Sequence, residues 1–335
     1  MLHSGGRFRR GQHGLPVGRL RSEAGVQLAG KRFLVTGGGG FIGRFVVREL
    51  LDSGAHVRVM ELPGRGDVVA SQSGHTDHLE LFGGNLTLPD DCRRACDGID
   101  GVFHMGVLAL NPSGQDPRRC VEVNVNGTFN IFEAARDAGV TRIVFSSASS
   151  VYGDTLEIMD EAHPLNSRHI YGASKIAGEA FLRAFGGMFG INWVALRYMN
   201  VYGPNAGFGL VDAVLKRIAS GQAPQINGDG SQSFDFVYVS DVAGATVRAM
   251  ASDVTDEAFN VGSGEERTVK DVTLALLDLT QSDLKPDYRD VSVPMIRRVG
   301  SSEKASRLLD WRAGVNLTEG LRRVVAEQYF GNAPS

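Results

Sequence analysis

The stretch KRFLVTGGGGFIGRFVV, at residues 31–47, decides how this 335-residue chain folds. An apolar run at 33–35 stops at four glycines, and apolar residues then recur at helical spacing from Phe41 onwards. This pattern predicts a short buried strand, a glycine turn and an amphipathic helix. A unit of this kind typically begins a parallel sheet with helices on both faces.

The spacing of the glycines at 37, 40 and 43 indicates what the turn binds. Gly37 can carry the chain out of the strand, Gly40 lets the backbone approach a pyrophosphate, and Gly43 lets the helix lie close on the sheet. The N–H groups of the first helical turn, at Phe41 and Ile42, are expected to face the phosphates. The stretch therefore predicts a dinucleotide site.

An acid follows the next apolar run and bears on which dinucleotide is bound. The run at 57–62 would be the second strand, and it contains Glu61, eighteen residues after Gly43. A carboxylate there accepts hydrogen bonds from the adenosine ribose and repels a 2′-phosphate, so we expect NAD rather than NADP. Arg65 leaves NADP open, and a solvated charge at a strand end is the alternative interpretation of Glu61.

The composition is that of an ordinary enzyme, with 42% hydrophobic residues, 22% charged residues and a net charge of −3. We therefore expect no nucleic-acid partner. There is no apolar run near the ~20 residues that span a bilayer, so no membrane association is expected. The three cysteines at 92, 96 and 120 predict neither a disulfide framework nor a metal site, and a cytoplasmic location is the expectation. Residues 1–29 are rich in arginine and are expected to form a disordered tail.

Two further strand ends should reach the dinucleotide. The run at 79–82 predicts a third strand, followed by Asn85 and Leu86, and Asn85 either contacts the adenine or simply forms a turn. A fourth strand runs into Met105 and Gly106 beside the expected path of the cofactor. Because the carboxyl ends of parallel strands meet at one edge of the sheet, all four residues are candidate cofactor contacts.

Polar residues mark the next helix and the next strand. A helical pattern covers 117–138 and holds Asn124 at its centre, either in a packing network or against a neighbouring catalytic helix, near the cofactor. A fifth strand at 142–147 ends in a serine-rich segment, with Ser147 and Ser149 as candidate catalytic hydroxyls. Ligands bind at such strand ends in parallel sheets.

Tyr171 and Lys175 carry the strongest catalytic signal. They are four residues apart on a predicted helix and so share a face. A free phenol has a pKa of about 10, and a neighbouring cation would favour its ionised form. We expect Lys175 and the positive nicotinamide ring to supply that field, which makes Tyr171 an acid–base catalyst.

The chain resembles the extended short-chain dehydrogenase/reductase family, in particular its NAD-dependent sugar epimerase/dehydratase branch, over roughly residues 31–330. The motifs that carry the resemblance are TGGGGFIG at 36–43, NVNGT at 124–128, SVYG at 150–153, YGASK at 171–175, RYMNVYGP at 197–204, DFVYVSDV at 235–242 and FNVG at 259–262.

The resemblance implies a doubly wound Rossmann-type sheet over residues 30–203, with some later segments interleaved. A smaller α/β substrate domain would occupy mainly residues 204–330 and include a helix at 241–250. Tyr171 would exchange a proton with a sugar hydroxyl, while Lys175 would hold the nicotinamide ribose. Asn200 would contact a diphosphate-linked substrate. The helices at 117–138 and 170–187 resemble the pair that forms a homodimer interface in the family.

Two positions depart from the family pattern. Ala148 stands where members usually carry a serine or threonine that bonds to the reacting hydroxyl, so Ser147 or Ser149 would have to replace it. Phe234 stands where nucleotide-sugar members commonly have an arginine for the diphosphate, which leaves Arg297 or Arg298 for that role.

The resemblance favours an epimerase acting at C4 of a sugar, with a nucleotide-linked sugar as the expected substrate. Dehydratases and decarboxylases of the branch carry carboxylates where this chain has Ser149 and Ser150, so they are weaker alternatives. A net sugar or alcohol dehydrogenase without a nucleotide handle is favoured by Phe234. A non-catalytic NAD-binding protein is favoured only by Ala148.

Overall fold

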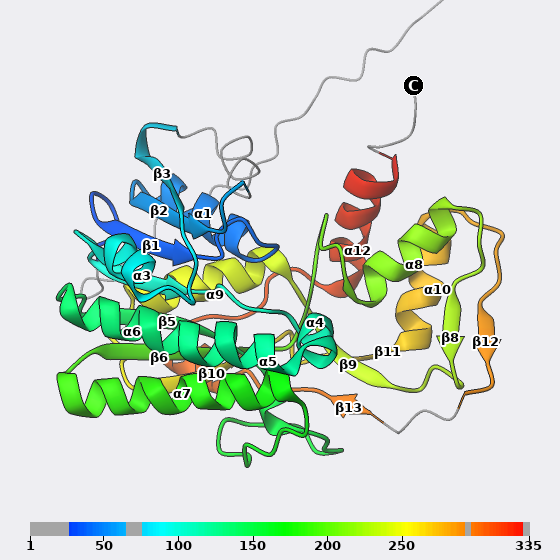
Figure 1. The fold of residues 1–335 in the computed structure, drawn as a ribbon. Helices are drawn as coiled ribbons and strands as arrows, with labels where there is room; N and C mark the ends of the chain where they lie inside the picture. Colours follow the sequence, from blue (N-terminus) through cyan, green and yellow to red (C-terminus); the bar gives the residue numbers. More distant parts are fainter. Residues whose placement is uncertain (1–26, 65–75, 292–295, 331–335) are drawn as a thin grey trace, which may run out of the picture.

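A computed structural model describes residues 27–64, 76–291 and 296–330. Seven parallel strands form its main sheet, in the order β10-β6-β5-β4-β1-β2-β3 (Figure 1). Their bounds are β1 Arg32–Thr36, β2 His56–Glu61, β3 Leu79–Gly83, β4 Gly101–His104, β5 Arg142–Ala148, β6 Asn192–Tyr198 and β10 Glu257–Val261. The order reverses next to β1, so the carboxyl ends of β1 and β4 flank the crevice where such sheets bind ligands.

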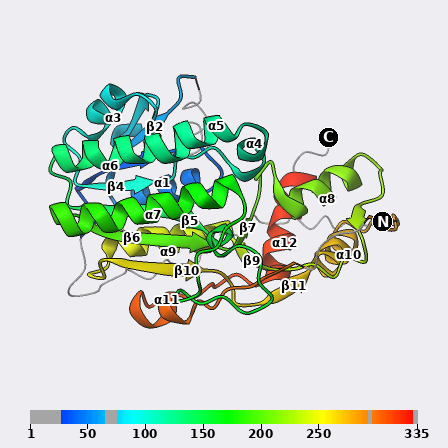
Figure 2. The ribbon, with the colours of Figure 1, turned by 60° about the horizontal axis from the view of Figure 1, so that its bottom comes forward.

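Helices cover both faces of this sheet, as the sequence predicts. One face carries α1 (Gly43–Asp52) and α9 (Val239–Ala251), whose apolar sides share one core with the strands. The other carries α3 (Pro89–Cys96), α6 (Gly127–Asp137) and α7 (Ile170–Phe189) over a second core (Figure 2). The helix expected at 241–250 in the smaller domain therefore lies elsewhere: as α9 it packs against α1 and the main sheet.

A smaller mixed sheet lies beside the carboxyl edge of the main one (Figure 1). In it β9 (Ser233–Tyr238) is flanked by β11 (Glu266–Thr268) and β13 (Arg297–Arg298), and β7 (Asn200–Tyr202) pairs with β9 further along. Around them lie β8 Gln225–Asn227, β12 Asp287–Arg289, α8 Gly209–Ala219, α10 Val269–Leu279, α12 Leu317–Val325 and η4 Ala326–Phe330. Their apolar residues form a third core.

The helix expected at 117–138 is divided into three pieces. It comprises α5 (Pro117–Cys120), a π-helical segment η2 (Val121–Asn126) and α6. The π-helical turns contain Asn124, and such turns often occur at functional sites because they redirect side chains. The remaining short elements are η1 Thr76–His78, α4 Leu110–Gln115, η3 Ser149–Tyr152 and α11 Glu303–Leu308.

Candidate active site

The glycine turn between β1 and α1 has no room for a side chain at Gly37 or Gly43. Gly37 has φ +68°, and a Cβ on it would lie 2.7 Å from the Cα of Gly106. A Cβ on Gly43 would lie 2.2 Å from the Gly37 carbonyl oxygen. The amide of Gly40 donates to that same carbonyl at 3.0 Å. These contacts bring the first helical turn of α1 up to the strand ends, which fits a dinucleotide diphosphate against bare backbone.

Glu61 ends β2 beside this turn. Its Oε1 accepts a hydrogen bond from the Gly39 amide at 2.9 Å, so the carboxylate is held against the glycine turn. Arg65, the residue that left NADP open, lies outside the described residues.

The first and fourth strand ends meet at Thr36, the last residue of β1. The Thr36 hydroxyl accepts from the amides of Met105 and Gly106, at 3.1 and 3.0 Å. Leu86 closes the other side, because a Cβ on Gly106 would touch its side chain at 2.8 Å. Asn85 instead accepts the Thr87 amide through its own side chain at 3.0 Å, the bond of a local asparagine turn.

Asn124 joins the π-helical segment to α7. Its Oδ1 accepts the Leu108 amide at 2.7 Å, and its Nδ2 donates to the Ser174 hydroxyl at 3.1 Å. Ser174 in turn donates to the Tyr171 carbonyl at 2.7 Å. Both interpretations of Asn124 therefore apply. Its side-chain amide has hydrogen-bond partners on both atoms, and it contacts the helix that carries Tyr171.

Lys175 lies under the end of β5. Its Nζ donates to the Ser146 carbonyl at 2.5 Å and lies 4.8 Å from the Phe145 ring centroid and 5.8 Å from that of Tyr171. Burial lowers the pKa of Lys175 to about 7, against the fields of Cys120 and Glu179.

Tyr171 is harder to ionise than the sequence predicts. Burial, with a smaller contribution from Cys120, raises the pKa of its phenol to about 12. The expectation that Lys175 lowers this pKa is therefore not met in the protein alone, because removing the phenol from water raises the pKa and burial also disfavours the charge on Lys175.

The serines after β5 differ in what they contact. Ser147 donates to the buried carboxylate of Glu179 at 2.6 Å, so its hydroxyl is turned into the core rather than towards a substrate. Ser149 is buried in η3, which packs on the start of α7. Ser150 lies beside it, and its hydroxyl is buried with no hydrogen-bond partner among the described residues. The sequence interpretation missed Glu179, for which the spacing to Lys175 offered the only signal.

Asn200 and Arg298 lie on one face of the smaller sheet. Arg298 pairs with Phe234 across β13 and β9, and Asn200 pairs with Phe236 two residues further along. Paired residues project to the same face, as do residues two apart on one strand. Phe234 is thus flanked by a guanidinium on the neighbouring strand.

The two candidate arginines differ in their partners. Arg297 is held by the Glu266 carboxylate and the Leu156 carbonyl. The Arg298 side chain is 17% exposed, and its one charged neighbour in the described part of the chain is Asp154, at 3.9 Å. Burial lowers the pKa of Arg298. Arg298 is therefore the better anion ligand.

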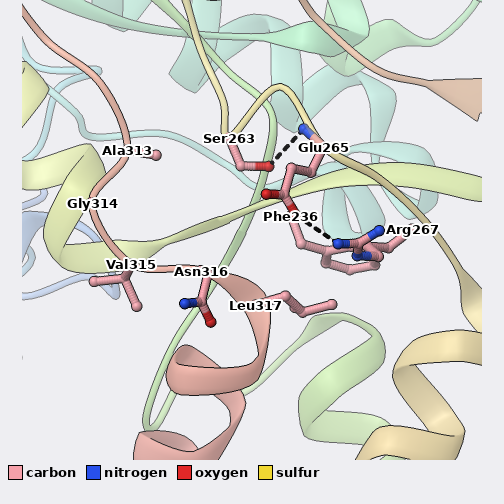
Figure 3. A pocket seen from close by; sticks show the side chains of 9 residues that line it. All are labelled: Phe236, Ser263, Glu265, Arg267, Ala313, Gly314, Val315, Asn316 and Leu317. Carbon is pink, nitrogen blue, oxygen red and sulfur yellow. Dashed lines mark hydrogen bonds and ion pairs between the residues drawn. The ribbon is translucent and has the colours of Figure 1, made fainter.

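A cavity of about 110 Å³ lies on the Phe236 side of the same sheet (Figure 3). Arg267 reaches across its mouth to Glu265, at 2.7 Å. The residues that line it are Phe236, Ser263, Glu265, Arg267, Ala313, Gly314, Val315, Asn316 and Leu317. It is smaller than the ~300 Å³ at which ligand pockets typically begin, and none of the candidate site residues named above lines it.

Within the described ranges, no helix has the length and apolar character to cross a bilayer. In the same ranges no three His, Cys, Asp or Glu side chains come together as metal ligands.

Comparison with known proteins gives one consistent result. Residues 33–262 match the model of the NAD dependent epimerase/dehydratase family. A UDP-glucose 4-epimerase of Mycolicibacterium smegmatis is 31% identical over 312 residues, which cover 90% of this chain and 99% of that protein. The Thermotoga maritima UDP-glucose 4-epimerase, solved with UDP-glucose, superposes with a TM-score of 0.82 at 30% identity, covering 90% of this chain and 98% of that one. The Thermus thermophilus UDP-glucose 4-epimerase, in complex with NAD, has a TM-score of 0.80 at 31% identity, covering 90% and 100%.

Proposed function

Because the chain belongs to the NAD dependent epimerase/dehydratase family, we propose that it is a nucleotide-sugar 4-epimerase. It is an NAD-dependent enzyme of that family, and its cofactor is NAD. The observation that carries the finer proposal is the segment beside Tyr171: residues 147–150 offer hydroxyls and a methyl group, and none of the carboxylates needed to eliminate water or direct a decarboxylation. Proton exchange on a hydroxyl is then the chemistry left to the site.

NAD would lie along the carboxyl ends of the first four strands. The glycine turn and the amides of Phe41 and Ile42 would hold its diphosphate, and Glu61 its adenosine ribose. Asn85 and Leu86 would line the adenine side. The other residues assigned to the cofactor, towards the nicotinamide, are Met105, Gly106, Asn124, Tyr171 and Lys175.

Tyr171 would take the proton from the sugar hydroxyl and return it after the sugar has turned. Bound NAD would supply reversible hydride transfer at the carbon that carries this hydroxyl. Lys175 would hold the nicotinamide ribose and add positive charge near the phenol. Ser149 is our candidate for a hydroxyl within about 3.2 Å of the reacting oxygen, since Ser147 already serves Glu179.

The substrate side would be built mainly from residues 204–330. Arg298 would bind the diphosphate in place of the arginine that Phe234 replaces, and Asn200 would contact the same handle from the shared sheet face. A half-buried guanidinium with one distant carboxylate is well suited to a phosphate group.

The test is to incubate the protein with UDP-glucose and follow C4 inversion by NMR, with mass spectrometry of the ligands released on denaturation. We expect interconversion of the two epimers without net NADH formation, and NAD retained by the protein. Stoichiometric release of NADH would instead favour the second candidate, a net sugar dehydrogenase without a nucleotide handle, which Phe234 supports.

We also propose a homodimer formed through α6 and α7. Exposed apolar side chains gather on these helices and the π-helical segment before α6: Val121, Phe129, Ile170, Met188 and Phe189. Sedimentation velocity of a Phe129→Glu variant, which should dissociate if this face is the interface, tests the proposal.

A further inference from the structure

A buried ion pair lies one helical turn beyond Lys175. Glu179 of α7 is fully buried, and its carboxylate accepts from Arg197 of β6, Nε–Oε1 at 3.0 Å and Nη2–Oε2 at 2.7 Å. Ser147 of β5 donates to the same carboxylate at 2.6 Å. Three elements that surround the catalytic centre therefore meet at one side chain.

Arg197 extends this contact to the segment after β5. Its Nη1 donates to the Tyr152 hydroxyl at 2.9 Å and to the Glu161 carbonyl at 3.1 Å. Tyr152 donates to the side-chain oxygen of Asn260 at 2.6 Å, and the backbone amide of Asn260 donates to the Glu161 carboxylate at 2.7 Å. The ion pair thus fixes η3 and the loop that follows it in one hydrogen-bonded frame.

Stability alone is a poor reason for this arrangement. Replacing a buried ion pair by well-packed apolar residues is often neutral or stabilising, because burial costs both charges their hydration. The ion pair does fix geometry, because a bidentate guanidinium–carboxylate pair sets the relative direction of the two side chains as well as their distance. In this protein the ion pair fixes the end of β5. Ser147 donates to Glu179 there, and the preceding Ser146 carbonyl accepts from Lys175.

We propose that Glu179 and Arg197 form a positioning unit of the catalytic centre, which fixes Lys175 through the end of β5. The inference rests on the proposed function only in assigning Lys175 a role as a cation.

The electrostatic part of this role follows from the groups that face Lys175. Burial lowers the pKa of Lys175, and the two groups that oppose it are Cys120 on α5 and Glu179. His104 on β4 stays neutral, because burial and then the charge of Lys175 lower its pKa to about 3. Tyr171 stays protonated near neutral pH, because burial raises its pKa to about 12. Removing the Glu179 charge therefore leaves Cys120 alone against burial.

A Glu179→Gln variant tests the unit, because it keeps the side-chain shape and removes the charge. We expect the alkaline loss of turnover to move to lower pH by about one unit, a tenfold change in proton concentration. The affinity for NADH, followed by its fluorescence, should weaken at correspondingly lower pH, because a protonated Lys175 would hold the nicotinamide ribose more strongly than a neutral one. Ser147→Ala separates the two parts of the role: it removes the hydrogen bond to β5 but no charge, so it should lower kcat while the alkaline limb stays in place. Glu179→Asp should restore the limb.

An unpaired buried Arg197 could prevent Glu179→Gln from folding. The double variant Glu179→Gln/Arg197→Gln removes both charges and keeps the experiment readable. A wild-type pH dependence of NADH affinity in a folded variant that lacks the Glu179 charge would overturn the inference. The NADH arm needs no sugar substrate, so an incorrect assignment of the sugar reaction would leave it intact.

Discussion

Tyr171 is the residue at which the proposed chemistry can be measured most directly. Burial raises the pKa of its phenol to about 12. Ionising it at pH 7 therefore costs about 7 kcal/mol, since each factor of ten corresponds to ~1.4 kcal/mol. Lys175, with a pKa of about 7, can offset only part of this cost. Oxidised NAD, when bound, would add a positive charge that favours the phenolate, so proton transfer from the sugar should be tied to the oxidised cofactor.

We expect Tyr171→Phe to lower kcat by roughly 10²–10⁴, or about 3–5 kcal/mol, because it removes the acid–base group and keeps the ring. The NAD content should stay near wild type. The assay is NMR of epimer interconversion, combined with the NAD released on denaturation. Tyr198→Phe is the matched control: this buried tyrosine of β6 bonds to Thr246 at 2.8 Å and has no proposed role, so its kcat should fall only a few-fold.

The reasoning fails if Tyr171→Phe turns over at the wild-type rate. It also fails if Tyr198→Phe loses as much activity as Tyr171→Phe, because the loss would then report on packing near the sheet rather than on a proton. Loss of bound NAD in Tyr171→Phe would point to a structural effect.

The other predictions concern the cofactor and the groups around Tyr171. NAD should bind at least tenfold more tightly than NADP, because Glu61 would face the 2′-phosphate, and equal affinities in titration calorimetry would contradict this. Gly43→Ala should abolish retained NAD while the chain still folds, because its Cβ would enter the space of the Gly37 carbonyl; mass spectrometry of released ligands and circular dichroism test both halves. Ser149→Ala should lower kcat about tenfold or more. Ser147→Ala should lower the free energy of unfolding by about 2 kcal/mol, because its bond is to a charged group. Burial lowers the pKa of Lys175 from 10.5 to about 7, so between these values the unfolded chain holds a proton that the folded protein has lost. Stability relative to Lys175→Met should therefore rise from pH 7 to about 10, and a fall in urea unfolding experiments would show that this lysine is not buried as described.

Local sequence patterns predicted the features that are formed by residues close together in the chain. The strand, glycine turn and helix at 31–47 are recognisable because the turn needs glycine for steric reasons that spacing alone reveals. Tyr171 and Lys175 share a helix face, so their juxtaposition also follows from a four-residue spacing. Five strands of the main sheet were predicted on the same basis, and the doubly wound architecture as a whole was expected from the family resemblance.

Contacts between distant segments were not predictable in this way. Nothing local distinguishes Ser147 from Ser149 as a free hydroxyl, because the difference is a carboxylate, Glu179, that arrives from another helix. The packing of α9 on α1 depends on a chain path that returns from the smaller sheet to the larger one. The π-helical segment around Asn124 departs from the helical period by a single residue, which an amphipathic pattern hardly registers.

The proposed substrate side also depends on a contact between distant segments, which the structure supplies. In the sequence, Phe234 stands where nucleotide-sugar members of the family commonly have an arginine. The missing positive charge argues against a diphosphate-linked sugar. Read across the sheet, Arg298 pairs with Phe234 from a strand of two residues, too short to show any period in the sequence. The register places its guanidinium on the face that also carries Asn200, and its single distant carboxylate leaves it able to bind a phosphate. A positive charge is therefore present beside Phe234, on the neighbouring strand. The proposal of a nucleotide-linked substrate depends on Arg298.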